Sequence, residues 1–459
     1  MEPGADKRSA LTKAALLVAG RLLGIFPGAT QIAANMGWLF LDRLLRMGVG
    51  LLVSAWVARY LGPEQFGLMN FALAFTGLFA AFAGLGLQGI AVRDSVRDPE
   101  KAALTLGTTA LLQLAGAALA YLAMIVAVSC LRPDDMLARS TIAVLGALLF
   151  VKAGEFTNYW FESQVQSRYI VWVQGVGFLV FAGLKVALIV LEAPFLAFVY
   201  AVLGEAAVVA LCSLVVMDKR GHPLRKLRAS MQRARMLLAD CWPLMLAAVA
   251  VTAYMKIDQI MIGQMLGDHS VGLYSAAVRV TEIWFFIPMA VVASLFPSIL
   301  QARDDHPEAY NLRLQRLYDL MALLGLCISL AVTLCSGLLV ELMFGSEYAA
   351  SARILSIHVW SAVFVFLGVA SSQQLVAEHR QTLSLERTVL GMGLNIVLNF
   401  SLIPAHGPAG AAVASLLSQM SAAFFYDLIR EETRPMFLMK ARALNPARVL
   451  AALRGGRKP

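Results

Sequence analysis

Apolar segments of about 20 residues recur along this chain from Met36 to Ile429. A helix that crosses the hydrocarbon core of a bilayer needs about 20 mainly apolar residues, because each residue advances the helix by only ~1.5 Å. Of the 459 residues, 59% are hydrophobic and 15% are charged, whereas soluble domains carry about 25% charged residues. The sequence therefore predicts an all-α integral membrane protein.

We expect about 12 transmembrane helices, separated by short turns that contain Gly, Pro and Asp. The expected spans are residues 36–59, 67–92, 104–130, 140–161, 169–191, 194–217, 238–265, 271–299, 317–343, 350–376, 384–403 and 408–429. They define five regions: an N-terminal segment with an interfacial helix (1–35), an N-lobe of six helices (36–217), a basic linker (218–236), a C-lobe of six helices (237–430) and a basic tail (431–459).

The distribution of Lys and Arg predicts the orientation. If both termini are cytoplasmic, most basic residues lie in the inner segments, and the outer loops hold Arg59, Arg132 and Arg139. Loops on the cytoplasmic side of membrane proteins carry an excess of Lys and Arg. This location also accounts for the net charge of +9 without nucleic acid, which we do not expect as a partner.

The two halves contain a similar turn. Leu-Gly-Pro-Glu-Gln-Phe-Gly-Leu at 61–68 recurs as Leu-Gly-Asp-His-Ser-Val-Gly-Leu at 266–273, and each copy follows the first span of its half. Chance similarity of two short glycine-containing turns is the alternative. If the repeat is real, the halves share one orientation, and such parallel repeats are a transporter architecture.

Charged side chains within the spans are the candidate functional residues, because a charge in hydrocarbon costs roughly 2.5–3.5 kcal/mol on insertion scales. A cationic cavity that binds phosphate would use Arg46, Lys152, Lys256 and Arg279. Carboxylates that could take up a coupling ion are Glu155, Asp258 and Glu282. Pairs three or four residues apart, such as Lys152–Glu155 and Arg279–Glu282, share a helix face, so a structural salt bridge is an equal alternative there.

Other chemistry finds no support in the sequence. Gly84-Leu-Gly-Leu-Gln-Gly89 fits a dinucleotide-binding pattern in form, but it lies inside an apolar segment without a βαβ context. The five cysteines have no metal-ligand spacing. We therefore expect neither an enzyme nor a metal site, and no cofactor apart from a coupling H⁺ or Na⁺.

Several segments resemble Wzx-type polysaccharide flippases. The turn Arg-Tyr-Leu-Gly-Pro-Glu-Gln-Phe-Gly at 59–67 is similar to their R-Y-L-G-P-x-x-F-G turn, and residues 254–263, 271–277, 284–288 and 295–297 resemble their seventh and eighth helices. These proteins belong to the multidrug/oligosaccharidyl-lipid/polysaccharide (MOP) exporter superfamily. The resemblance implies two six-helix lobes around a central cavity lined chiefly by helices one, two, seven and eight.

The resemblance also implies a function. The substrate would be an undecaprenyl-pyrophosphate-linked oligosaccharide, flipped to the periplasmic leaflet of a bacterial inner membrane by alternating access. Partners would be this lipid-linked sugar, membrane lipids, and a polysaccharide polymerase with its assembly proteins. Two alternatives remain open: a drug/cation antiporter of the same superfamily, which predicts a more acidic cavity, and a membrane-embedded polymerase or glycosyltransferase, which predicts a larger outer loop.

Overall fold

The computed structural model describes residues 29–445 except 165, 167, 221–223 and 306, and the side chains of residues 29–45 are not part of that description. The expected interfacial helix within 1–35 therefore lies largely outside the described residues, as does the tail beyond residue 445. Every regular element in the described part of the chain is helical.

The elements follow one another with short connections. They are α2 (Ala29–Ala83), α3 (Gln88–Arg97), η1 (Pro99–Lys101), α4 (Ala102–Leu131), α5 (Met136–Gly146), α6 (Leu148–Lys152), η2 (Ala153–Glu155), α7 (Phe156–Ser163), α8 (Arg168–Val190), α9 (Phe195–Lys219), η3 (Leu224–Lys226), α10 (Met231–Met265), α11 (Asp268–Glu282), η4 (Ile283–Phe285), α12 (Phe286–Asp305), α13 (Pro307–Phe344), η5 (Ser346–Tyr348), α14 (Ser351–His358), α15 (Ser361–Ala377), α16 (Gln381–His406), α17 (Pro408–Ala423), η6 (Phe425–Leu428) and α18 (Arg434–Ala443).

Eleven helical stretches among the described residues are long and apolar enough to cross a membrane. The first, residues 46–97, contains most of the first expected span and all of the second, because α2 continues through a break at Gly62 (φ 69°, ψ 171°). A non-glycine residue is strained at such a positive φ. With this break counted, the prediction of an all-α membrane protein of about 12 helices is confirmed.

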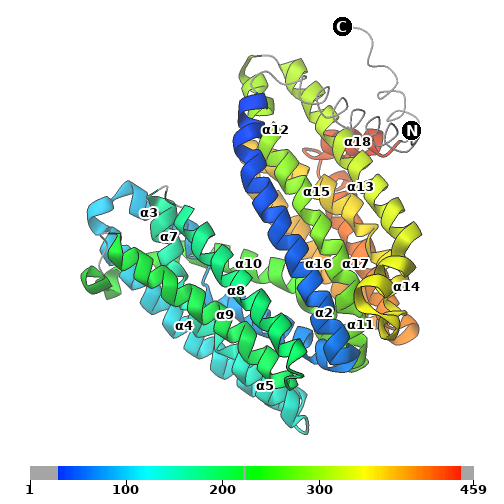
Figure 1. Ribbon diagram of the computed structural model, residues 1–459. Coiled ribbons are helices and arrows are strands. Elements are labelled where there is room, and N and C mark those ends of the chain that lie inside the picture. The colour runs from blue at the N-terminus through cyan, green and yellow to red at the C-terminus, as the bar shows by residue number, and fades with distance from the viewer. Residues whose placement is uncertain (1–28, 165, 167, 221–223, 306, 446–459) are drawn as a thin grey trace, which may run out of the picture.

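The helices form two bundles that lie together at one end and diverge toward the other (Figure 1). Helices α3 to α9 make the N-terminal bundle, and α11 to α18 make the C-terminal bundle. The first helix of each half, α2 and α10, runs between them: α2 packs on α4 and α8 as well as α11, and α10 packs on α4 as well as α16. We call the converging end the closed end and the diverging end the open end.

The repeated turns meet each other at the closed end. Gly62 and Gly267 both have a positive φ, 69° and 83°. A Cβ atom on Gly67 would lie 1.8 Å from the carbonyl oxygen of Asp268, and one on Gly272 would lie 2.0 Å from that of Pro63. Only glycine permits this approach, so the two copies of the turn pack against one another where the bundles converge. Matching conformations at an offset of 205 residues favour a genuine repeat over chance similarity.

The first helix of the basic tail, α18, is tied to the C-terminal bundle by a buried ion pair. The Lys440 ammonium donates to the Asp427 carboxylate at 2.7 Å and to the Ala423 carbonyl at 2.6 Å, and both charged side chains are fully buried. Burial lowers the pKa of Lys440 from its ordinary 10.5 to about 8, although Asp427 opposes the shift.

This shift predicts a pH dependence of stability. Between pH 8 and 10.5 the unfolded chain keeps a proton on Lys440 that the folded chain has released. Folding stability rises with pH wherever the unfolded state binds more protons. We therefore expect the unfolding free energy of the wild type to rise across this window relative to a Lys440→Met/Asp427→Asn double variant, measured on the detergent-solubilised protein. If the difference in unfolding free energy between the wild type and the double variant stayed constant or fell from pH 8 to 10.5, the lowered pKa of Lys440 would be contradicted.

Candidate functional site

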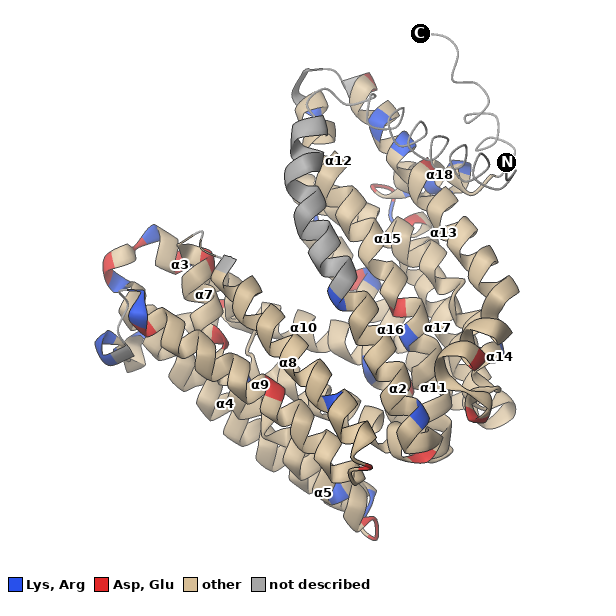
Figure 2. Ribbon diagram, in the orientation of Figure 1, with Lys and Arg blue, Asp and Glu red and all other residues tan. Residues whose placement is uncertain are grey.

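Charged residues lie mostly at the ends of the helices, and a smaller set lies within the bundles (Figure 2). Part of that set lines a cavity of about 180 Å³ where α2, α10 and α11 meet. The lining residues are Asn70, Leu73 and Ala74 from α2, Lys256 and Gln259 from α10, and Ser275, Val278, Arg279 and Glu282 from α11. We call this the junction cavity, because these helices join the two bundles.

The junction cavity has a cationic excess. The Lys256 ammonium lies 3.6 Å from the Glu282 carboxylate, and each side chain is about one-third exposed (33%). Arg279 lines the same cavity and has no ion pair within the described part of the chain. Arg279 and Glu282 therefore do not form the pair that their spacing allows, because Glu282 pairs with Lys256 on the neighbouring helix instead. Two cations against one carboxylate leave a net charge of +1 for an anionic ligand.

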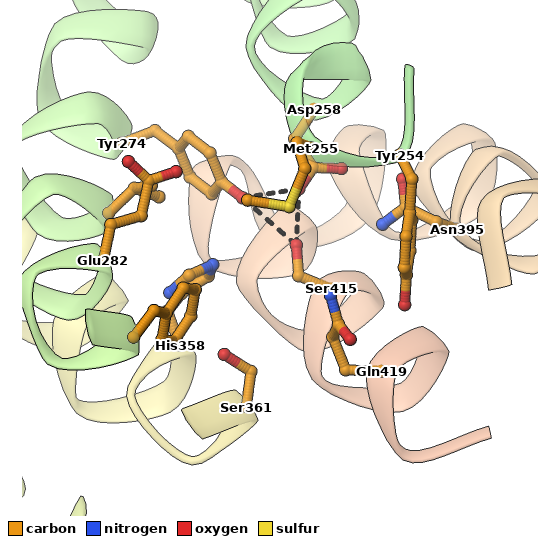
Figure 3. A pocket seen from close by; sticks show the side chains of 12 residues that line it. Tyr254, Met255, Asp258, Tyr274, Glu282, His358, Ser361, Asn395, Ser415 and Gln419 are labelled. Atoms are coloured by element: carbon orange, nitrogen blue, oxygen red, sulfur yellow. Dashed lines mark hydrogen bonds between the residues drawn. The ribbon is translucent and has the colours of Figure 1, made fainter. Parts of the chain in front are cut away.

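Asp258 occupies a second, smaller pocket of about 30 Å³ inside the C-terminal bundle (Figure 3). Its carboxylate accepts hydrogen bonds from the Tyr274 hydroxyl at 2.6 Å, from the Asn399 amide at 2.6 Å and from the Ser415 hydroxyl. These donors come from α11, α16 and α17, so the carboxylate joins four helices. All three are neutral, and we call this the carboxylate pocket.

Helix geometry explains why Lys256 and Asp258 separate. Each residue of an α-helix is rotated by about 100° about the helix axis, so residues two apart point to nearly opposite sides of the helix. Lys256 therefore faces the junction cavity, whereas Asp258 faces the core of the C-terminal bundle. Glu282 lines both spaces. It ends α11 where the helix tightens into η4, and a 3₁₀ turn within a long helix often marks a functional hinge.

The other candidates lie elsewhere. Arg46 lies beside Gly175 of α8, and Lys152 and Glu155 lie at the break between α6 and α7. None of these three lines the junction cavity or the carboxylate pocket. The structure thus brings together Lys256, Arg279, Glu282 and Asp258, and it leaves Arg46, Lys152 and Glu155 outside the two pockets.

Two intramembrane charges, Lys185 and Glu205, have no opposite charge three or four residues away in the sequence. They pair with each other at 2.7 Å between α8 and α9. This ion pair neutralises both side chains inside the N-terminal bundle, and we assign it a structural role.

Sequence reasoning missed an ion pair at the closed end. Arg132, after α4, contacts both carboxylate oxygens of Asp268 at the start of α11, each at 2.8 Å. Arg132 also donates to the Gly263 carbonyl at 2.8 Å and lies 4.0 Å from the centre of the Phe71 ring. Both charged side chains are about 90% buried, at 10% and 11% exposed. Since the partners are 136 residues apart, no local spacing could have indicated them.

The described part of the chain thus folds into two helical bundles with a charged cavity at their junction. Known structures share this fold. An inward-facing multidrug resistance MATE transporter of the MOP superfamily superposes with a TM-score of 0.68 at 17% identity, over 90% of this chain and 96% of the other. The lipid II flippase MurJ in an inward closed conformation also gives 0.68, at 11% identity, over 91% and 93%.

Sequence comparisons give the family. Residues 32–303 match the family described as "Polysaccharide biosynthesis protein", and residues 243–401 match the MatE family. The chain is 25% identical to the "Probable low-salt glycan biosynthesis flippase Agl15" of Haloferax volcanii, over 83% of this chain and 79% of the other. It is 19% identical to the "Capsular polysaccharide biosynthesis protein CapF" of Staphylococcus aureus, over 85% and 97%. The chain belongs to the polysaccharide biosynthesis protein family, which confirms the resemblance found in its sequence.

Proposed function

We propose that this protein is a flippase that moves a lipid-linked glycan across the membrane by alternating access. The observation that carries the proposal is the junction cavity, where Lys256 and Arg279 lie between two bundles that diverge at one end. Ammonium and guanidinium groups lower the cost of bringing a phosphate into the membrane, Lys as a point charge and Arg as a two-pronged donor. The names of the relatives Agl15 and CapF support a role in glycan biosynthesis.

The substrate we propose is an oligosaccharide on undecaprenyl pyrophosphate. Its pyrophosphate would bind Lys256 and Arg279 beside the uncharged polar residues Asn70 and Gln259 of the same cavity, and its lipid tail would stay in the bilayer. The cavity of about 180 Å³ holds only the charged part of such a molecule, so the sugars would extend toward the open end. A polymerase and assembly proteins would act on the flipped product.

We assign the open end to the cytoplasm of a bacterial cell, with the protein in its inner membrane. The loop after α9 and the start of α10 carry Arg225, Lys226, Arg228 and Arg233. Arg233 pairs with Asp94 of α3 at 2.7 Å, and α3 lies at the open end of the N-terminal bundle (Figure 1). A basic excess favours the cytoplasmic side. In this orientation both termini are cytoplasmic, and the described conformation faces inward.

Ion coupling would use the two carboxylates of the C-terminal half. Glu282 pairs with Lys256 at 3.6 Å, so protonation of Glu282 would raise the positive charge facing the pyrophosphate. Asp258 and Glu282 both line the carboxylate pocket. Uptake of H⁺ or Na⁺ from the outer side would thus change the affinity for the substrate between the inward and outward states.

A deletion strain tests the proposal. We expect loss of the surface glycan and accumulation of one complete lipid-linked oligosaccharide on the cytoplasmic side, identified by mass spectrometry. Expression of the chain from a plasmid should restore the surface glycan and remove the accumulated intermediate. If single glycan units still reached the surface, a polymerase would be the better assignment.

The MatE match favours one second candidate, an exporter of cationic drugs. Such an exporter needs an acidic site, whereas the junction cavity has a net positive charge. Increased drug sensitivity of the deletion strain, with unchanged surface glycan, would support this alternative.

A further inference from the structure

His358 lies in the carboxylate pocket and has a ring nitrogen without a partner. It is 7% exposed and ends α14. Its Nδ1 atom is buried and accepts or donates no hydrogen bond within the described residues. The imidazole points into the pocket between Glu282 and Ser415 (Figure 3). A buried polar atom without a hydrogen bond lowers stability by about 1–3 kcal/mol. A molecule bound in the pocket that hydrogen-bonds to Nδ1 would remove this cost.

The pocket has the size and polarity to hold one water molecule. Its volume of about 30 Å³ exceeds the roughly 10–15 Å³ that one water needs. Besides His358, the Ser361 hydroxyl and the Asn395 amide nitrogen face the pocket without partners in the described part of the protein. Three such groups satisfy the two to four hydrogen bonds that a buried water makes. A water here would connect Nδ1 to the other polar groups.

The titratable side chains around His358 come from two helices. Tyr254 and Asp258 belong to α10, and Tyr274 and Glu282 belong to α11. The remaining polar lining residues, from α15, α16 and α17, do not titrate. The His358 and Tyr274 rings meet edge to face with their centres 6.0 Å apart, and the Tyr274 hydroxyl donates to Asp258. His358 is thus the one lining residue whose ordinary pKa lies near neutrality.

We propose that His358 carries the coupling proton between Glu282 and Asp258, so that the ion used at this site is H⁺. A proton leaves the Glu282 carboxyl group and adds to Nδ1 of the neutral imidazole, directly or through one water, which leaves a carboxylate and an imidazolium. The imidazolium then gives a proton to Asp258 through the pocket and becomes neutral again. The inference rests on the proposed ion-coupled flippase and names its ion and its carrier.

The test is an NMR titration of the whole protein in lipid nanodiscs, with histidine labelled by ¹⁵N. The His358 resonance is the one missing from a His358→Gln variant. We expect it to titrate between pH 5 and 8, and its midpoint to fall by about one pH unit in Glu282→Gln, because loss of a nearby carboxylate disfavours the imidazolium. A resonance that does not titrate between pH 5 and 9, or a midpoint unchanged in both Glu282→Gln and Asp258→Asn, overturns the proposal. So does a midpoint that differs between NaCl and KCl, because Na⁺ would then occupy the site.

Complementation of the deletion strain gives the second readout. We expect His358→Gln to lower surface glycan formation about tenfold or more and to flatten its dependence on external pH. The matched control is His406→Gln, since His406 is exposed at the end of α16 and should behave like the wild type. Failure of the wild type itself to complement would contradict the flippase assignment, whereas the NMR titration reports on His358 independently of the substrate.

Discussion

Replacement of both Lys256 and Arg279 by Gln should abolish glycan flipping while the protein still folds and inserts. In the proposed function each side chain would make a charge-assisted contact to the pyrophosphate of the substrate, and such hydrogen bonds contribute about 1.5–3 kcal/mol. Loss of one should lower the flipping rate roughly 10- to 100-fold, and loss of both more than 100-fold, since 1.4 kcal/mol corresponds to a factor of ten. The measurement is surface glycan in the complemented deletion strain, at matched protein level.

The control for this pair removes two charged side chains elsewhere in the membrane. Lys185 and Glu205 form an ion pair within the N-terminal bundle, 2.7 Å apart and away from the junction cavity. A Lys185→Gln/Glu205→Gln double variant should keep most of the flipping activity. Normal surface glycan in the Lys256→Gln/Arg279→Gln variant would remove both residues from the mechanism.

In the proposed orientation and mechanism, removal of the ion pair at the closed end should shift the protein toward an outward-open state. The Arg132–Asp268 pair joins the two bundles with two contacts of 2.8 Å and is about 90% buried. Loss of Arg132 leaves the Asp268 carboxylate buried without its partner, which costs about 3–5 kcal/mol. Loss of Asp268 has a smaller effect, because the Arg132 guanidinium keeps Asp135 at 3.4 Å. The conformation that contains the pair is therefore destabilised, and any state in which Arg132 or Asp268 reaches water gains population.

Cysteine labelling measures this shift. Ser275 lines the junction cavity. A Ser275→Cys variant, in a protein whose five native cysteines are replaced by Ser, therefore reports whether a reagent outside the cell reaches this cavity. We expect an impermeant maleimide added to intact cells to label the reporter at least tenfold faster after Arg132→Gln, and faster by a smaller factor after Asp268→Asn.

The exposed pair Lys101–Asp98 near the open end supplies the control for the labelling experiment. Its side chains are 70% and 41% exposed, and exposed ion pairs contribute only about 0–1 kcal/mol. Lys101→Gln should therefore leave the labelling rate unchanged. Equal labelling in the wild type and in Arg132→Gln would show that the pair does not hold the closed end.

The sequence determined the fold class because the bilayer restricts the choice of structure. Backbone groups in hydrocarbon must pair within the same segment, so apolar runs of about 20 residues become helices. The glycine positions were also readable: Gly62 and Gly267 recur at one offset, and both adopt a positive φ.

The tertiary structure alone decided which charges meet. Local spacing allowed an ion pair between Arg279 and Glu282, yet Glu282 pairs with Lys256 from the neighbouring helix. Only helix packing brings the hydrogen-bond donors of Asp258 together from three other helices, and only packing brings Arg132 next to Asp268. Helical periodicity reports which residues share a face of one helix, but it does not report which faces of different helices oppose each other. For that reason the sequence identified Lys256 and Asp258 as candidates, and the packing of α2, α10 and α11 showed that they serve different pockets.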